Sequence, residues 1–96
     1  MILNWYPEAE VDFLCAAKYY GQQDGNLESR FALLVETTTE RILLHPPIRP
    51  CFYGDCLRIK TEKFPSFIIY RLKGELIQII AVMHTSRRPG YWKGRL

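Results

Sequence analysis

The stretch that decides the fold is residues 75–84, which read Glu-Leu-Ile-Gln-Ile-Ile-Ala-Val-Met-His. Successive side chains of a strand point to opposite faces of the sheet. Strict alternation places Ile77, Ile79, Ala81 and Met83 on one face, and Leu76, Gln78, Ile80, Val82 and His84 on the other. Both faces are largely apolar, so the pattern predicts a central strand that is covered on both sides.

Two shorter strands are expected just before this one. Leu57, Ile59 and Thr61 alternate with Arg58 and Lys60, which is typical of a half-exposed strand. Residues 67–72, Phe-Ile-Ile-Tyr-Arg-Leu, predict a second strand, and Lys73-Gly74 predicts a tight turn into the long strand. The second half of the chain is therefore expected to form an antiparallel meander.

The first half predicts a short strand and two helices. Residues 2–6 are rich in strand-forming side chains, and Pro7 followed by acidic residues favours a helix over about residues 8–22. Asn26 is the expected N-cap of a second helix that ends at His45-Pro46-Pro47. Its apolar stripe comprises Leu27, Phe31, Leu34, Val35, Thr38 and Ile42.

These elements predict one α+β domain spanning residues 1–96, with an antiparallel helical hairpin packed on a small twisted antiparallel sheet. The hairpin is sufficient to cover one face of the long strand. Two explanations of the second apolar face stay open: the sheet curls on itself, or another chain lies across it.

Charge is distributed unevenly along the chain, whose net charge is +3. Residues 1–50 hold four cations against seven acids, and residues 51–96 hold nine cations against three acids. The basic half is expected to favour polyanions or an acidic partner.

Cysteine usage and hydropathy favour a cytoplasmic protein without a metal or cofactor. Three cysteines cannot close into a complete disulfide set, and His45, Cys51 and Cys56 lack the spacing of a structural zinc site. The role of Cys51 and Cys56 stays open. We find neither a transmembrane run of about 18 apolar residues nor a signal-peptide pattern in the first residues.

The segment after the long strand is the most distinctive, and it reads Arg87-Arg88-Pro89-Gly90-Tyr91-Trp92-Lys93-Gly94-Arg95. Arginine forks bind phosphates and carboxylates bidentately. Interleaved tyrosine and tryptophan either stack on bases or anchor a protein interface. For Trp92 alone, folding back onto the sheet is the favoured interpretation.

The sequence resembles the RelE/ParE toxin superfamily, and especially its ParE-like members, over nearly its whole length. The C-terminal signature is carried by residues 81–84 and 87–92, and the first family helix by Ala9, Asp12, Ala16 and the Tyr19-Tyr20 pair. Phe31, Glu36 and Ile42 before Pro46 resemble the second helix. Residues 63–70 resemble a basic-Phe-Pro-aromatic strand opening, in which Ser66 departs from the usual aromatic residue.

The resemblance implies a type II toxin that a cognate antitoxin neutralises by laying an extended or helical segment across it. ParE-like members inhibit DNA gyrase, whereas RelE-like members cleave ribosome-bound mRNA. Gyrase inhibition is the favoured mechanism, since no arginine stands within Phe67–Tyr70 where RelE-like enzymes place one. A non-toxic orphan that only binds antitoxin is a third interpretation.

The candidate site residues follow from these alternatives. A ribonuclease would use His84, Arg87, Arg88 and Tyr91 as base, cations and acid, with Lys60 or Lys63 nearby. Under the binding interpretation, the expected target and partner contacts are Arg58, Lys60, Lys63, Arg71, Ile77, Ile79, Met83, Arg87, Arg88, Tyr91, Trp92, Lys93 and Arg95.

Overall fold

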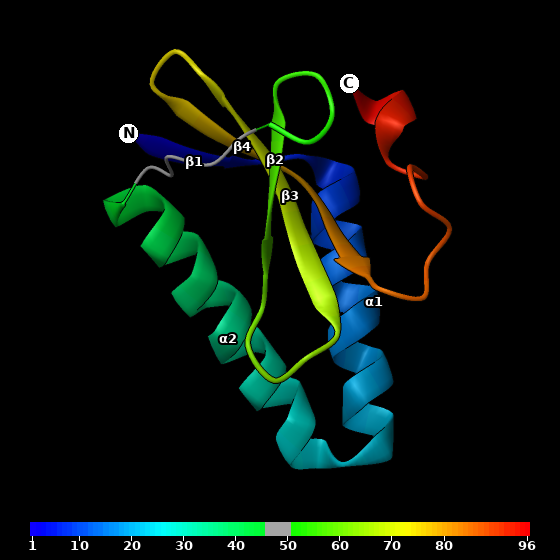
Figure 1. Ribbon diagram of the computed structural model, residues 1–96. Helices are drawn as coiled ribbons and strands as arrows, with labels where there is room; N and C mark the ends of the chain where they lie inside the picture. The colour runs from blue at the N-terminus through cyan, green and yellow to red at the C-terminus, as the bar shows by residue number, and fades with distance from the viewer. Residues whose placement is uncertain (46–50) are drawn as a thin grey trace.

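The computed structural model describes residues 1–45 and 51–96, and its helices pack on one face of a single sheet (Figure 1). The elements in chain order are β1 (Ile2–Trp5), α1 (Pro7–Gln23), α2 (Gly25–Leu44), β2 (Cys56–Lys60), β3 (Ser66–Lys73), β4 (Leu76–His84) and the short 3-10 helix η1 (Lys93–Arg95). The expected α+β class is confirmed. Helix α2 ends at Leu44 with His45 as its C-cap, as expected, whereas Pro46 and Pro47 lie outside the described residues.

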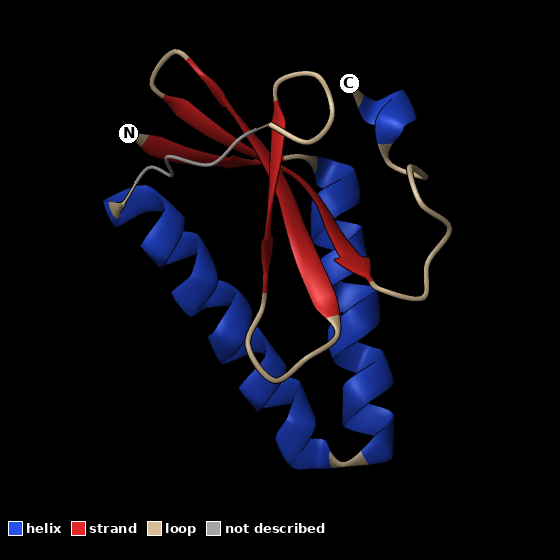
Figure 2. Ribbon diagram, viewed as in Figure 1, coloured by secondary structure: helices blue, strands red, loops and turns tan. Residues whose placement is uncertain are grey.

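The sheet has the strand order β1-β4-β3-β2, which places the long strand β4 in the interior as expected (Figure 2). Strands β2, β3 and β4 form the predicted antiparallel meander. Strand β1 instead runs parallel to β4, with Ile2 opposite Leu76 and Trp5 opposite Ile79. The sheet is therefore mixed, because the long connection through the helical hairpin lets the chain return in the same direction.

The connection between the helices is shorter than the sequence indicates, and this corrects the expected N-cap. Asp24 alone separates α1 from α2, and its extended backbone places its side chain over the start of α2. The Asp24 carboxylate accepts a hydrogen bond from the backbone N–H of Asn26 at 3.0 Å. Asn26, the expected N-cap, is already helical because Gly25 begins the helix.

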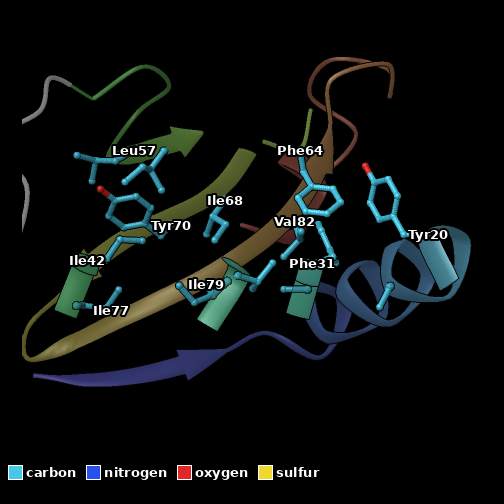
Figure 3. Close-up of a cluster of buried hydrophobic side chains, with 14 residues drawn as sticks. Tyr20, Phe31, Ile42, Leu57, Phe64, Ile68, Tyr70, Ile77, Ile79 and Val82 are labelled. Atoms are coloured by element: carbon cyan, nitrogen blue, oxygen red, sulfur yellow. The ribbon is translucent and has the colours of Figure 1, made fainter. Parts of the chain in front are cut away.

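The helices cover one face of the sheet with an aromatic and aliphatic core (Figure 3). Phe31 is fully buried, and its ring lies 5.1 Å from that of Tyr20 and 5.2 Å from that of Phe64. Val35 and Ile42 of the predicted stripe are also buried. The sheet contributes Leu57, Ile59, Ile68, Tyr70, Ile77, Ile79 and Val82.

The prediction of strict alternation along β4 is wrong, because a β-bulge interrupts the strand. Ile69 of β3 lies opposite Ala81, and the next residue, Tyr70, lies opposite Ile79. Ile80 is the extra residue, so strict alternation breaks there. As a result Ile77 and Ile79 share the helix-facing core with Val82, while Ile80 and Ala81 both belong to the core on the other face.

The cap assignment yields a stability prediction. Asp24→Ala should lower the free energy of unfolding by about 1 kcal/mol, because the first turn of α2 loses its side-chain acceptor. Chemical denaturation measures the difference. Asn26→Ala is the control and should change stability by less than about 0.5 kcal/mol; a larger loss in that control than in Asp24→Ala would contradict the assignment.

Candidate functional site: the C-terminal segment and its basic–aromatic surface

Residues 85–96, here called the C-terminal segment, leave the end of β4 and fold back along the sheet on the side away from the helices (Figure 1). The turn is fixed by backbone hydrogen bonds. Thr85 N–H donates to the carbonyl of Pro65 at 2.9 Å, and Arg87 N–H donates to that of His84 at 3.0 Å. The segment is thus tied to the sheet at the point where it begins.

Trp92 closes the second face of the sheet. Its side chain is 1% exposed and belongs to a core with Cys56, Ile69, Ile80 and Ala81. This confirms the fold-back expected for Trp92. It also answers the open question about the second face, since the chain's own C-terminal segment covers the middle of that face and no second chain is needed to bury it.

Two more side chains anchor the segment to helix α1. The Tyr91 hydroxyl donates to Asp12 Oδ2 at 3.0 Å, and Arg95 Nη1 lies 2.7 Å from the same oxygen. Burial, followed by the nearby Asp12 carboxylate, raises the pKa of the Tyr91 phenol well above its usual range. Tyr91 therefore remains a neutral hydrogen-bond donor.

Around Trp92 the molecule presents a basic–aromatic surface, formed by Phe52, Tyr53, Arg58 and Lys93. Phe52 and Tyr53 are 40% and 42% exposed, and each ring lies within 5.7 Å of the Trp92 ring. The Lys93 ammonium sits 4.0 Å from the centre of the Tyr53 ring, and the Arg58 guanidinium 4.9 Å from that of Phe52. They border a hollow of about 160 Å³, which Met83 also lines. Aromatic residues and arginine are enriched at protein interfaces.

The residues predicted as contacts fall into three groups, apart from Met83, which lines the hollow beside Trp92. Exposed cations are Arg58, Lys60, Lys63, Arg87, Arg88 and Lys93. Anchors within the fold are Tyr91, Trp92, Arg95 and Arg71, the last of which donates to Gln78 at 2.8 Å and to the Tyr6 hydroxyl at 2.7 Å. Ile77 and Ile79 are fully buried beneath the helices, which makes them core residues in this structure.

The residues predicted for a ribonuclease are not all brought together in one cleft. His84 and Arg87 line a hollow of about 550 Å³ beside Tyr19 of α1, and His84 Nδ1 accepts from the backbone N–H of Ser86 at 3.0 Å. The Lys60 ammonium, at the end of β2, instead donates to the carbonyls of Thr61 and Phe64.

Sequence reasoning missed Phe52, Tyr53 and Asp12 as parts of this site. The positions of Phe52 and Tyr53 in the sequence predict only a turn. Two adjacent aromatic residues in a turn could nevertheless have indicated a binding surface, because aromatic residues are enriched at protein interfaces. Asp12 is predicted only as part of the family's first-helix pattern, and one acid in the first turns of a helix is ordinarily explained by the helix dipole.

Residues 1–45 and 51–96, which the structure describes, hold neither a cluster of metal-ligating side chains nor a membrane-spanning helix. No three His, Cys, Asp or Glu side chains in these ranges are grouped so that they could hold a metal ion. None of the helices described there has the length and apolar character needed to cross a membrane.

Comparison with known proteins gives one family match and several structural neighbours. The family model described as the ParE toxin of the type II toxin–antitoxin system parDE matches residues 3–89. A solved structure of the chromosomal ParDE system from P. aeruginosa is similar, with a TM-score of 0.68, 21% identity, and coverage of 90% of this chain and 97% of that chain.

The isolated E. coli RelE toxin is also similar, with a TM-score of 0.58, 17% identity, and coverage of 98% of this chain and 94% of that chain. At these identities the structural matches show a shared fold. The curated proteins contain no match to the sequence.

The position of Trp92 yields a second stability prediction. Trp92→Ala should lower the free energy of unfolding by about 3–5 kcal/mol, because a fully buried indole is removed from the second core. Thermal or chemical denaturation tests this, and Trp92→Phe, which keeps a ring, should cost less. A loss below about 1 kcal/mol for Trp92→Ala would contradict the burial.

The Tyr91 environment yields a pH prediction. Its pKa is raised in the folded state, so the unfolded chain loses this proton first, near pH 10. Tyr91 therefore contributes stability below that pH, and the contribution is lost as the pH rises further. Unfolding free energies measured between about pH 9 and pH 11 should fall less steeply in Tyr91→Phe than in the wild type; parallel curves would refute the assignment.

Proposed function

The chain belongs to the ParE toxin family of type II toxin–antitoxin systems, and we propose that it arrests bacterial growth by binding and inhibiting DNA gyrase through its C-terminal segment. Gyrase inhibition is the activity that the resemblance to ParE-like toxins implies. The proposal concerns a binding function, with the exposed cations of this segment as the principal contacts.

One observation carries the proposal: the C-terminal segment is anchored and cationic at the same time. Trp92 is buried against the sheet and Tyr91 is bonded to Asp12, while Arg87 and Arg88 before these anchors and Lys93 after them stay exposed. A prearranged set of side chains loses less conformational entropy when it binds. Arginine and aromatic residues are also the types that contribute most to protein interfaces.

The contacts of the alternative catalytic residues favour binding over RNA cleavage. The Tyr91 hydroxyl already donates to Asp12, and its raised pKa makes it a poor proton donor to a leaving group. His84 and Lys60 make separate local hydrogen bonds, each with its own neighbours in the chain. Ribosome-dependent RNA cleavage is therefore the alternative activity, and the expression experiment below distinguishes it from gyrase inhibition.

We further propose that a cognate antitoxin neutralises the chain in the cytoplasm. The similar P. aeruginosa structure is that of a ParDE toxin–antitoxin system. Residues 51–96 carry nine cations against three acids, so an acidic antitoxin segment would be attracted to this half of the chain. The basic–aromatic surface offers such a segment both charge and apolar contact.

Expression in a bacterial host without antitoxin tests the proposal. Growth should stop, cells should form filaments with a DNA-damage response, and purified protein should inhibit supercoiling by gyrase. Rapid loss of translation with cleaved mRNA would support the ribonuclease instead. Normal growth after confirmed folded expression would support the orphan interpretation and overturn the proposal.

Two double variants, each of which removes two positive charges, test which surface is responsible for toxicity. Arg87→Ala with Arg88→Ala should reduce toxicity and gyrase inhibition by at least about tenfold, the scale of one lost charged contact of about 1.4 kcal/mol. Lys18→Ala with Arg30→Ala removes the same charge from exposed positions on the helices, and should retain full activity. Equal loss in both pairs would place the functional surface elsewhere.

A further inference from the structure

Among the described strands, none pairs with one edge of the second half of β4. Strand β1 pairs with β4 only from Leu76 to Ile79, and Tyr6 N–H makes the last contact, with the carbonyl of Ile79 at 2.9 Å. Beyond the bulge, no strand among residues 1–45 and 51–96 pairs with this side of Ile80 to His84. Unpaired strand edges attract other chains, so proteins normally block them.

Side chains close this edge in place of a strand. The carbonyl of Ile80 accepts from Arg95 Nη1 at 2.9 Å, and the N–H of Val82 donates to Asp12 Oδ2 at 3.2 Å. The carbonyl of Val82 accepts from the Tyr91 hydroxyl at 3.4 Å. Three backbone groups that a neighbouring strand would bind are thus satisfied by α1 and the C-terminal segment.

Asp12 joins all of these contacts. Its two oxygens bind the Arg95 guanidinium bidentately, at 2.7 Å and 3.1 Å, and Oδ2 also accepts from Tyr91. The Asp12 and Arg95 side chains are only 8% and 15% exposed, so water screens the pair little. A bidentate arginine–carboxylate pair of this kind fixes geometry as well as distance.

The contacts continue from Asp12 to an exposed cation. The Tyr91 ring, held by its hydroxyl, lies beneath the Arg87 guanidinium at 4.1 Å and beside that of Arg95 at 5.0 Å. The orientation of Arg87 therefore depends on that of Tyr91, and the orientation of Tyr91 depends on Asp12.

We propose that Asp12 is the positioning residue of the toxin: it contacts no target itself, but it holds the C-terminal segment so that Arg87 and its neighbours are presented to the target. This inference rests on the proposed function, because it assigns Asp12 a part in that same site. It adds a residue from helix α1, far from the segment in the sequence.

Asp12→Asn is the direct test, since it keeps the shape of the side chain but replaces one acceptor oxygen with a donor. Amide hydrogen exchange of residues 85–96 should accelerate by at least about tenfold, with exchange in Phe31 and the rest of the helix-facing core unchanged. Unchanged exchange in residues 85–96 would overturn the proposal.

Toxicity and gyrase affinity supply the functional readout. Asp12→Asn should weaken gyrase binding by at least about tenfold, and Arg95→Gln should do the same, because each removes one side of the same pair. The double variant should lose little more than either single variant. Additive losses, or full toxicity in Asp12→Asn, would contradict a positioning role.

Two controls separate positioning from general destabilisation. Glu10→Gln removes one exposed charge from the same helix, and Asp24→Ala destabilises the fold at a distance from the segment. Both should stay toxic. If the wild type itself neither arrests growth nor binds gyrase, the proposed function fails, while the exchange comparison still decides whether Asp12 holds the segment.

Discussion

The ion pair between Asp12 and Arg95 is the interaction on which the placement of the C-terminal segment depends. It lies where β1 has ended and β4 continues, so the same carboxylate closes a strand edge and fastens the C-terminal segment. Without it, Tyr91 would lose a hydrogen-bond partner and the edge at Ile80 and Val82 would be open. One buried contact therefore links helix, sheet and segment.

The bulge at Ile80 makes this arrangement possible. By shifting the alternation of β4, it places Ile80 and Ala81 together beneath Trp92 and still returns Val82 to the helix-facing core. A regular strand would place Ile80 and Ala81 on opposite faces of the sheet. The apolar second face thus belongs to the chain's own fold, and a cationic and aromatic rim surrounds Trp92 at the surface.

The sequence predicted the parts of the fold that depend on local periodicity. The stripe around Phe31 and the turn at Gly74 identified the helical hairpin and the meander, and the apolar run of β4 identified the interior strand. The parallel pairing of β1, the bulge and the Asp24 cap escaped prediction. Each depends on which strands pair or on the length of a connection, and a hydrophobic pattern alone predicts neither of them.

The sequence identified the exposed cations of the candidate site, but it did not identify the residues that hold them in place. Arg87, Arg88 and Lys93 are exposed as expected, whereas Ile77 and Ile79 proved to be core residues. The sequence placed Asp12 in the family's first-helix pattern but could not indicate its contact with Arg95, which lies 83 positions away.

If Asp12 and Trp92 hold the C-terminal segment as described, that segment is an ordered part of the isolated chain. Backbone order parameters from nuclear magnetic relaxation measure this without any partner or activity assay. We expect values of about 0.85 for Tyr91 to Arg95, as in a rigid backbone, and values below about 0.6 would contradict the anchoring of the segment.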